Sequence, residues 1–475
     1  MQTTKTNVKV KRKGIISLDQ IVWDPKVYPR MKWSTATIER YAEALEAGDE
    51  FPPLVLEEGT NRLLDGKHRL EAYKKVEMAE VPVEWHTVPE GMSAKYYAAT
   101  LSAAHGDRLS YTDLKALAEE EFTANPSMSA ADWGRRLGVP ERTVRRWVSH
   151  ITDRWRRSRE VQAWHLYQLG WTQEEIGEKL GIAQQTVSDV LTENGHLADF
   201  GKLIGPNWNE KGLQQEAERL GIPLIDAWAA TLDGMPDDER LNRLGIKVQP
   251  YDVWQFSSCH DLMGSKYPGR IPGELVCHVL YFFTEPGDLV IDPMVGSGTT
   301  LDACLLMGRK CRGYDIDLRH ERIDVEKHDL SEGWPDVVTK VSLIFWDPPY
   351  FDKMDEKNIG EEGYQEGSIS GLAPNEYLSW FGERFAQLYK AVKSGVKLAF
   401  LMSDWDPENA KDHKDHQGLF LWDYADLLRS TGWKLVRQIQ CPLPTQQVHP
   451  DIVNKFRKTR RLARLGRYLL VAQRE

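Results

Sequence analysis

Short apolar runs and longer amphipathic segments alternate along the second half of the chain. The apolar runs are typical of strands buried on both faces of a parallel sheet, and segments such as 374–392 and 422–430 have the apolar spacing of helices that cover such a sheet. The last two strands are predicted to close the sheet as an antiparallel hairpin. The predicted strands span residues 289–292, 343–346, 397–402, 433–439 and 467–472. The pattern predicts an α/β domain over residues 249–475.

The first hundred residues have a different pattern. A predicted amphipathic helix at 35–47 is surrounded by short strands with turn residues between them, which predicts a small α+β domain over residues 1–105. Gly66, Lys67, His68 and Arg69 begin a further helix, where a glycine and cations can hold an anion such as phosphate. The predicted strands span residues 15–21, 53–56, 62–64 and 81–85.

Two similar segments, 129–147 and 172–191, follow this domain. Each has the layout of a helix-turn-helix, with a glycine at the turn and small or apolar residues where the helices cross. The predicted recognition helices are 140–148 and 183–191. Side chains there that suit phosphates and base edges are Arg142, Arg145, Arg146, Gln184, Gln185 and Ser188. Residues 106–200 are therefore predicted to bind DNA, and the alternative is that these helices contact only protein.

Composition limits the class of protein. A chain of 475 residues is too long for one core, and residues 201–248 are predicted to be a partly helical linker. The five cysteines form no Cys-x-x-Cys pair, which disfavours a zinc site and fits a reducing cytoplasm. No apolar run approaches the length of a membrane span, so no membrane association is expected. With a net charge of −10, DNA contact must come from local basic faces.

Candidate chemistry follows two of the predicted strands. Gly296 and Gly298 come directly after the first apolar run and allow a ligand to approach the backbone at the start of a helix. Asp315 ends the next predicted strand, which is where doubly wound folds bind ribose hydroxyls. The spacing indicates a nucleoside-type cofactor. In the helix after Thr300, we predict that Asp302 is a surface residue and that Cys304 and Met307 fill the core.

This region resembles the amino-methylating DNA methyltransferases. Residues 292–300 read Asp-Pro-Met-Val-Gly-Ser-Gly-Thr-Thr, which matches the cofactor loop of that family except for Met294 at a phenylalanine position, and residues 347–350 match its Asp-Pro-Pro-Tyr run fully. The resemblance implies a Rossmann-like domain that binds S-adenosyl-L-methionine. The implied cofactor-binding residues are Asp292, Pro293, Gly296, Ser297, Gly298, Thr299, Thr300, Asp315, Asp329, Tyr267 and Pro268.

The Asp-Pro-Pro-Tyr run suits methyl transfer to an amine. An exocyclic amino group is a poor nucleophile because its lone pair is delocalised into the ring. The Asp347 carboxylate and the Pro348 carbonyl can accept its two hydrogens and favour a nucleophilic geometry, while Pro349 stiffens the turn. Tyr350 can stack on a base that has been flipped out of the duplex. No metal is required.

Residues 14–100 resemble the ParB-like N-terminal domain of partition proteins. Those proteins typically carry Gly-Glu-Arg-Arg at the position of Gly66 to Arg69 and bind cytidine triphosphate. Their later phosphate-binding element has no clear counterpart around residues 98–108. Nucleotide binding is therefore left open, and the alternative is that His68 and Arg69 cap and pair locally.

Together these features predict a cytoplasmic, site-specific methyltransferase acting on adenine amino groups in double-stranded DNA. The alternatives are a ParB-type DNA-binding or partition protein with a non-catalytic methyltransferase half, and a cytosine-amino or RNA methyltransferase. The combination of modules resembles proteins of phages and mobile elements; restriction-modification is a further expectation, although the sequence does not show whether a partner nuclease exists. The short interval between Thr300 and Asp347 leaves no room for a target-recognition insert. We therefore expect the first 200 residues to supply site recognition, and the sequence does not determine the oligomeric state.

Overall fold

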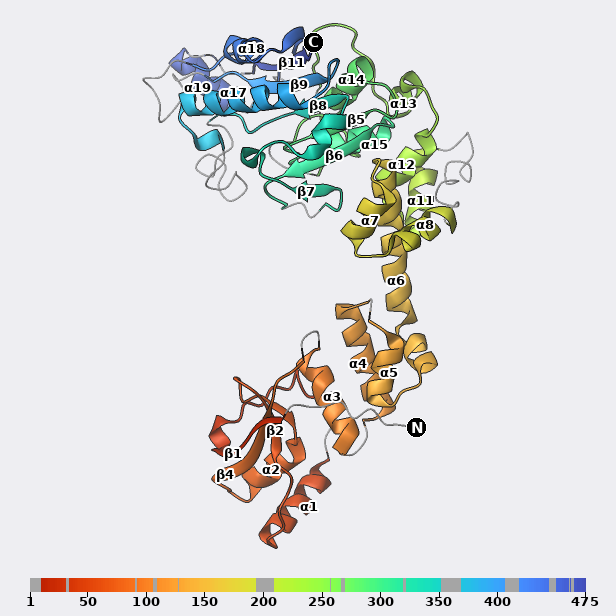
Figure 1. Ribbon diagram of the computed structural model, residues 1–475, viewed down its shortest axis with the longest axis vertical. Helices are drawn as coiled ribbons and strands as arrows, with labels where there is room; N and C mark the ends of the chain where they lie inside the picture. Colours follow the sequence, from red (N-terminus) through yellow and green to blue (C-terminus); the bar gives the residue numbers. More distant parts are fainter. Residues whose placement is uncertain are drawn as a thin grey trace. The chain divides into compact units, whose positions relative to one another are not determined.

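A computed structural model describes residues 10–30, 34–89, 92–105, 109–126, 128–193, 209–256, 258–265, 270–318, 322–351, 369–405, 418–443, 450–460, 462 and 465–475 (Figure 1). The chain divides into two compact units, Met1–Arg157 and Ser158–Glu475. The boundary falls inside helix α6 (Glu141–Gln168) and within the region predicted to hold both helix-turn-helix segments. Among the described residues, no helix combines the length and hydropathy needed to cross a membrane.

The first unit begins with a four-stranded sheet in the order β1-β4-β2-β3. Its strands pair antiparallel except for β2 and β4, which are parallel. The strands and the two helices beside them are β1 (Val10–Ser17), α1 (Thr35–Glu46), β2 (Leu54–Glu57), β3 (Leu63–Asp65), α2 (Lys67–Lys75) and β4 (Glu80–His86). This arrangement agrees with the predicted α+β domain.

Helices complete the first unit. They are α3 (Ala94–His105), α4 (Tyr111–Ala124), α5 (Ala130–Leu137) and the beginning of α6. The side chains of Ser110 and Ser129 cap α4 and α5, and Gly138 ends α5 with a φ of 70°. Trp133, Val144 and Trp147 are buried between these helices, so the first predicted helix-turn-helix is present.

The second unit contains a seven-stranded sheet in the order β10-β11-β9-β8-β5-β6-β7. β9, β8, β5, β6 and β7 are parallel, and β11 pairs antiparallel with both β9 and β10. The sheet is therefore doubly wound and closed by the predicted antiparallel hairpin. The strands are β5 (Leu289–Asp292), β6 (Lys310–Asp315), β7 (Val325–Lys327), β8 (Leu343–Trp346), β9 (Lys397–Ser403), β10 (Lys434–Gln440) and β11 (Arg467–Gln473).

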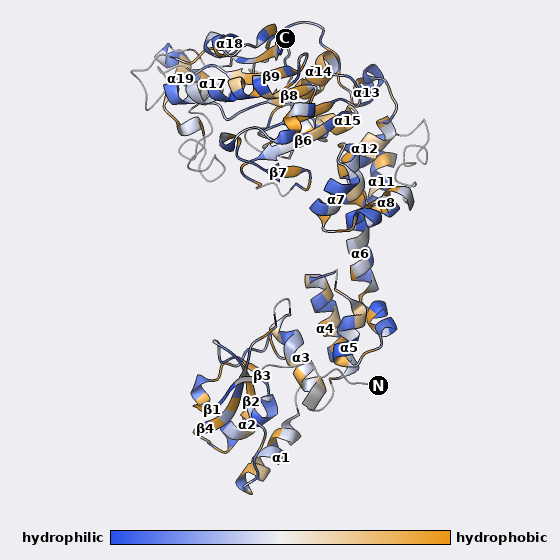
Figure 2. Ribbon diagram, in the orientation of Figure 1, coloured by the Kyte–Doolittle hydropathy of each residue, from blue (hydrophilic) through white to orange (hydrophobic). Residues whose placement is uncertain are grey.

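Helices cover both faces of this sheet, and successive side chains of a strand enter different cores. Val290 and Phe345 belong to the core shared with α14 (Gly273–Phe283) and α15 (Thr299–Leu306). Ile291 and Trp346 belong to the opposite core, with α17 (Pro374–Ala391) and α18 (Leu421–Ser430). Figure 2 shows the apolar character of β8, β9 and α14. The connection before β11 contains a further helix, α19 (Pro450–Thr459).

The region predicted as a linker contributes to the core of the second unit. It contains α11 (Glu210–Leu220), α12 (Leu224–Leu232) and α13 (Asp237–Arg243). Their buried residues share one apolar cluster with the sheet and with the end of α6, α7 (Gln173–Leu180) and α8 (Gln184–Glu193). The second helix-turn-helix, α7 and α8, is therefore part of the second unit.

Candidate active site

The two sequence motifs meet at the carboxyl ends of neighbouring strands. β5 pairs in parallel with β8, with Val290 opposite Leu343, and pairs with β6 on its other side. Because the chain places β6 and β7 on one side of β5 and then returns to place β8 on the other, the strand order reverses here. In doubly wound sheets such a reversal opens a crevice that binds the ligand. Asp292 ends β5 and Asp347 follows β8, the two strands that flank it, and Asp315 ends β6, the next strand beyond β5.

Backbone conformation shapes the loop after β5. Gly296 has a φ of 52° and Gly298 a φ of 91°, conformations that residues with a side chain rarely adopt. A Cβ atom at Gly296 would have open space around it, as expected of a position where a ligand can approach the backbone. The Gly296 amide donates a hydrogen bond of 2.8 Å to the Asp315 carboxylate, and α15 begins directly after Gly298.

The polar residues of this loop are largely buried. Asp292 is 2% exposed and accepts a hydrogen bond of 3.0 Å from the Met294 amide. Its burial raises the pKa of Asp292 to about 7, and the nearby Asp347 and Asp315 carboxylates act in the same direction. Ser297 and Thr299 share a hydrogen bond of 3.2 Å between their hydroxyl groups. Pro293 precedes Met294 in this loop, and Thr300 lies buried in the first turn of α15.

The Asp-Pro-Pro-Tyr run follows β8 and is tied to its surroundings at several points. The Tyr350 hydroxyl donates a hydrogen bond of 2.7 Å to the Asp347 carboxylate, and the Tyr377 hydroxyl donates one of 2.8 Å to the Pro349 carbonyl. Pro348 is buried, whereas Asp347 and Tyr350 are half-buried. Burial raises the pKa of Asp347 to about 6, although the Tyr350 hydrogen bond and the Arg467 charge lower it.

One contact joins the two motifs. The Trp346 indole N–H points to the Met294 sulfur at 3.4 Å. Met294 occupies the one position in residues 292–300 that departs from the family pattern, and it packs against the core that contains Trp346. The Met294 thioether thus fills this place beside the indole and connects the loop after β5 to β8.

A buried ion-pair network lies behind the loop, and it corrects the prediction for Asp302. Asp302 is 5% exposed and pairs with Arg322, with its closest oxygen 2.7 Å from Nη2. The Arg322 guanidinium also pairs with Asp324 at 2.7 Å. A Cβ atom on Gly298 would lie 2.3 Å from Arg322 Nη1, so Arg322 packs directly against the loop. Cys304 and Met307 are fully buried, as predicted.

Sequence reasoning did not identify Arg322, Asp324, Tyr377 or Arg467 as parts of this region. They come from other elements, and no motif marks them. The only available signal was that a charged residue inside an apolar helix, such as Asp302, needs a partner if it is buried.

The remaining predicted cofactor residues have different outcomes. Asp329 follows β7, and its carboxylate accepts a hydrogen bond of 2.8 Å from the Ser331 amide, which caps the 3-10 turn Leu330–Glu332. The His328 amide beside it donates to the Asp315 carbonyl at 3.0 Å, so this loop adjoins the end of β6. Tyr267 and Pro268 lie outside the described residues.

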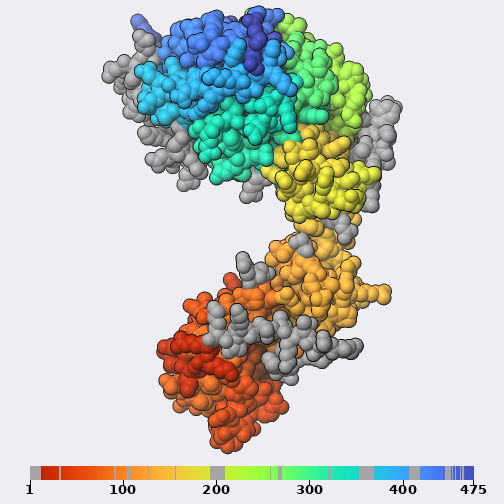
Figure 3. All heavy atoms as spheres, in the orientation of Figure 1, coloured from red at the N-terminus to blue at the C-terminus, as the bar shows by residue number. Residues whose placement is uncertain are grey.

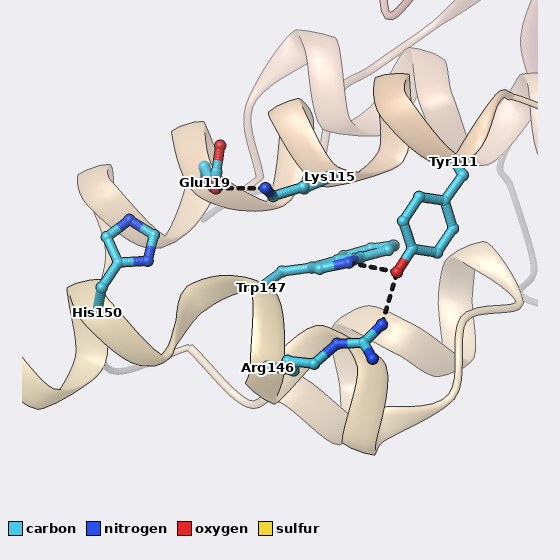
Figure 4. Close-up of a pocket in the computed structure, with 6 residues that line it drawn as sticks. All are labelled: Tyr111, Lys115, Glu119, Arg146, Trp147 and His150. Atoms are coloured by element: carbon cyan, nitrogen blue, oxygen red, sulfur yellow. Dashed lines mark hydrogen bonds and ion pairs between the residues drawn. The ribbon is translucent and has the colours of Figure 1, made fainter.

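In the first unit, the predicted DNA-contacting arginines lie on the first part of α6. Arg142, Arg145 and Arg146 are all exposed. Arg145 pairs with Glu141 at 2.6 Å. The Tyr111 hydroxyl accepts hydrogen bonds of 2.7 Å from Arg146 and 2.8 Å from the Trp147 indole (Figure 4). Tyr111 therefore holds Arg146 beside a shallow pocket that also contains Lys115, Glu119 and His150.

The cations of the ParB-like segment are paired within their own domain. Lys67 pairs with Glu71 at 2.6 Å and lies 3.8 Å above the Trp23 ring. Arg69 pairs with Asp65 at 2.7 Å and donates to the Pro53 carbonyl at 2.8 Å. His68 accepts a hydrogen bond of 3.1 Å from the Ser34 amide. These contacts agree with the local-pairing interpretation of this segment.

A family model matches the part of the chain that contains the loop after β5. Residues 228–326 match the family model described as DNA methylase, for N6 and N4 amino methylation. The match includes the loop after β5 and Asp315, and it ends before Asp347.

Two curated relatives match this chain over segments about as long as the family-model match. DNA adenine methyltransferase YhdJ of Escherichia coli (strain K12) is 32% identical over 90 residues, which are 18% of this chain and 31% of that protein. Type II methyltransferase M.HpaI of Haemophilus parainfluenzae is 34% identical over 86 residues, which are 18% of this chain and 27% of that protein. The chain thus spans less than a third of the length of these two relatives.

Solved structures show weaker similarity. TrmN from Thermus thermophilus is 14% identical with a TM-score of 0.27, covering 44% of this chain and 50% of that one. A Pnob8-like ParB-N domain is 12% identical with a TM-score of 0.22, covering 49% of this chain and 85% of that one.

Proposed function

We propose that this protein is a DNA methyltransferase that transfers a methyl group from S-adenosyl-L-methionine to an exocyclic amino group of a base. The observation that carries the proposal is the position of the Asp-Pro-Pro-Tyr run at the end of β8, beside the glycine loop at the end of β5. The family match over residues 228–326 supports the same class of reaction.

The loop after β5 suits a nucleoside cofactor. The open space at Gly296 lets a ligand contact the backbone, and α15 begins directly after Gly298, so its N-terminus adjoins this loop. The Gly296 and Asp317 amides donate hydrogen bonds of 2.8 and 2.9 Å to the Asp315 carboxylate and so fix its position at the end of β6, where doubly wound folds bind ribose hydroxyls. Bound there, S-adenosyl-L-methionine would supply an electrophilic methyl group.

The residues after β8 act on the amine. The Asp347 carboxylate accepts one amino hydrogen and the Pro348 carbonyl accepts the other, which directs the nitrogen lone pair away from the ring. The hydroxyls of Tyr350 and Tyr377 hold Asp347 and the Pro349 carbonyl in place. A preorganised pair of acceptors lowers the barrier because it needs no rearrangement during the reaction.

The proposed substrate is adenine in duplex DNA. An aspartate at the head of the Asp-Pro-Pro-Tyr run favours adenine in the family that this region resembles, and YhdJ is named a DNA adenine methyltransferase. The basic first helix-turn-helix supports a DNA substrate, because neutralising phosphates supplies much of the affinity for duplex DNA.

The decisive experiment measures transfer of labelled methyl from S-adenosyl-L-methionine to unmethylated plasmid DNA, followed by nucleoside analysis. We expect label in N6-methyladenine, and we expect Asp347→Ala to lower the rate by roughly 10²–10³-fold or more. Binding of S-adenosylhomocysteine by the variant controls for folding. Label in cytosine would correct the base, and label in RNA alone would correct the substrate. No incorporation by a folded, cofactor-binding wild type would contradict the proposal.

A further inference from the structure

The two helix-turn-helix segments have the same local geometry. Ser129 and Thr172 cap their first helices with their side chains, and Gly138 and Gly181 end those helices with φ angles of 70° and 63°. Inside the first helices, a Cβ atom on Gly134 would lie 2.3 Å from the Val139 carbonyl oxygen, and one on Gly177 would lie 2.8 Å from the Ile182 carbonyl oxygen. Residues 129–148 and 172–191 can therefore be compared position by position.

Their charges are opposite. Residues 129–148 contain five arginines and two acidic residues, whereas residues 172–191 contain one lysine and four acidic residues. The difference extends to the recognition helices. In place of the exposed Arg142, Arg145 and Arg146 of the first segment, the second has Gln185, Ser188 and Asp189. An acidic surface repels DNA phosphates, so the second segment lacks the electrostatic basis for binding a duplex.

The second segment is instead anchored to the catalytic sheet. Arg312 of β6 is 6% exposed, and its guanidinium donates to the Leu169 and Gly170 carbonyls at 3.1 Å each. It also pairs with Glu175 of α7 at 2.9 Å and lies 4.7 Å from the centre of the Trp171 ring. Arg312 therefore contacts two backbone carbonyls, a carboxylate and an aromatic ring. These contacts hold the end of α6 and the start of α7 against β6.

Further contacts extend this anchor. The Cys311 amide of β6 donates to the Leu169 carbonyl at 3.0 Å, and Lys179 of α7 donates to the Val325 carbonyl of β7 at 3.0 Å. Trp171, Ile176 and Val187 are buried in the same core as the sheet. Figure 3 shows this segment, in yellow, packed against the region of β6 and β7.

We propose that the two helix-turn-helix segments have different roles. The first contacts duplex DNA. The second is a structural joint that fixes the end of α6 to the cofactor-binding sheet and does not contact DNA. This assignment replaces the predicted DNA contacts of Gln184, Gln185 and Ser188, and it rests on the proposed function in taking duplex DNA as the substrate.

The test measures the affinity of the full-length protein for a fluorescent duplex oligonucleotide at several salt concentrations. In one variant, Arg142→Gln and Arg145→Ser give the first segment the residues of the second. In its reciprocal, Gln185→Arg and Ser188→Arg give the second segment those of the first. A third variant, Gln185→Ala with Ser188→Ala, removes the second segment's polar side chains. Thermal unfolding checks that each variant is folded.

We expect the first variant to bind about tenfold or more weakly and to show a salt dependence shallower by about two phosphate contacts. The other two variants are expected to bind within about twofold of wild type. Weakening by Gln185→Ala with Ser188→Ala, strong tightening by the arginine pair in the second segment, or no change in the first variant would each overturn the assignment. Methyl transfer is measured on the same wild-type preparation, so its absence would contradict the proposed function separately.

Discussion

Asp347 is the residue whose protonation state controls the proposed chemistry. A protonated carboxyl group loses acceptor capacity towards the amine, so the ionised form is the active one. Burial raises the pKa of Asp347 to about 6, and the Tyr350 hydrogen bond and Arg467 charge limit that rise. We therefore expect the single-turnover methylation rate to be constant above pH 7 and to fall as pH decreases through about 6.

Two variants that each lack one tyrosine hydroxyl test whether Asp347 causes this fall in rate. Tyr350→Phe removes the hydrogen bond that lowers the pKa of Asp347, so the acid midpoint is expected to move to higher pH. Tyr377→Phe is the matched control, because that hydroxyl contacts the Pro349 carbonyl and should leave the midpoint unchanged. The rate is measured from pH 5 to 8. An identical midpoint in Tyr350→Phe and wild type would contradict this account of Asp347.

At the scale of the elements, a buried charge cluster connects α6 to α12 and to the segment before β7. His165 of α6 contacts Asp226 at 2.7 Å through Nδ1 and Asp324 at 3.1 Å through Nε2. Asp324 also pairs with Arg322, which lies against Gly298 of the cofactor loop. Breaking a buried pair by removing one partner typically costs about 3–5 kcal/mol. The cluster therefore holds the end of α6 to the strands that carry the site.

This cluster predicts a loss of stability at alkaline pH. Burial lowers the pKa of His165, but Asp226 and Asp324 outweigh it and raise the pKa to about 10, from 6.5 in the unfolded chain. Because the folded pKa is the higher one, the stabilisation is complete below about pH 6.5 and is lost as pH rises through about 10. The unfolding temperature of the second unit should fall between pH 7 and 10 by calorimetry.

Two histidine variants test whether His165 causes the predicted loss of stability at alkaline pH. His165→Gln should lower the unfolding temperature at pH 7 and flatten its decrease above that pH. His278→Gln is the control, since His278 is buried in the same unit but its pKa is lowered by that burial, so it contributes no alkaline loss. An equally steep alkaline decrease in His165→Gln and wild type would show that another group is responsible.

At the scale of the whole molecule, the division into two units determines where the chain can be cut. Removing residues 1–157 leaves the core of the second unit complete. We expect this shortened protein to fold and to bind S-adenosylhomocysteine with the affinity of the full chain, while its affinity for duplex DNA decreases strongly. Calorimetric titration and fluorescence anisotropy measure the two affinities.

A deletion of residues 1–200 is the contrasting case. It removes Leu169, Trp171 and Ile176, which are buried in the core of the second unit, and it leaves Arg312 without its partners on α7 and the end of α6. We expect this protein to fail to fold. The hypothesis that the first 200 residues supply site recognition must therefore be tested with the cut at 157. Full duplex affinity in the shorter deletion would contradict the role proposed for the first helix-turn-helix.

The sequence by itself determined the strand-helix alternation and the positions of the catalytic motifs. Runs such as 289–291 and 343–346 are apolar throughout, which is the local signature of a strand buried on both faces. Gly296, Gly298 and the Asp-Pro-Pro-Tyr run follow those strands directly, so their placement at the carboxyl edge follows from chain order. The bounds of α17, Pro374–Ala391, agree with the predicted helix 374–392, because helix capping and apolar spacing are also local features of the sequence.

Only the tertiary structure decided which charged residues are buried and which helices belong to which unit. Asp302 has the spacing of an ordinary helix residue, and its burial depends on Arg322, which comes from another segment. Residues 201–248 mix charged and apolar residues with no motif that assigns them to a domain, yet α11, α12 and α13 place apolar residues in the core of the second unit. The two helix-turn-helix segments share one layout in the sequence, and the assignment of the second to the other unit depends on contacts such as those of Arg312, which anchors it to β6. Such long-range pairings leave no periodic signal in the chain.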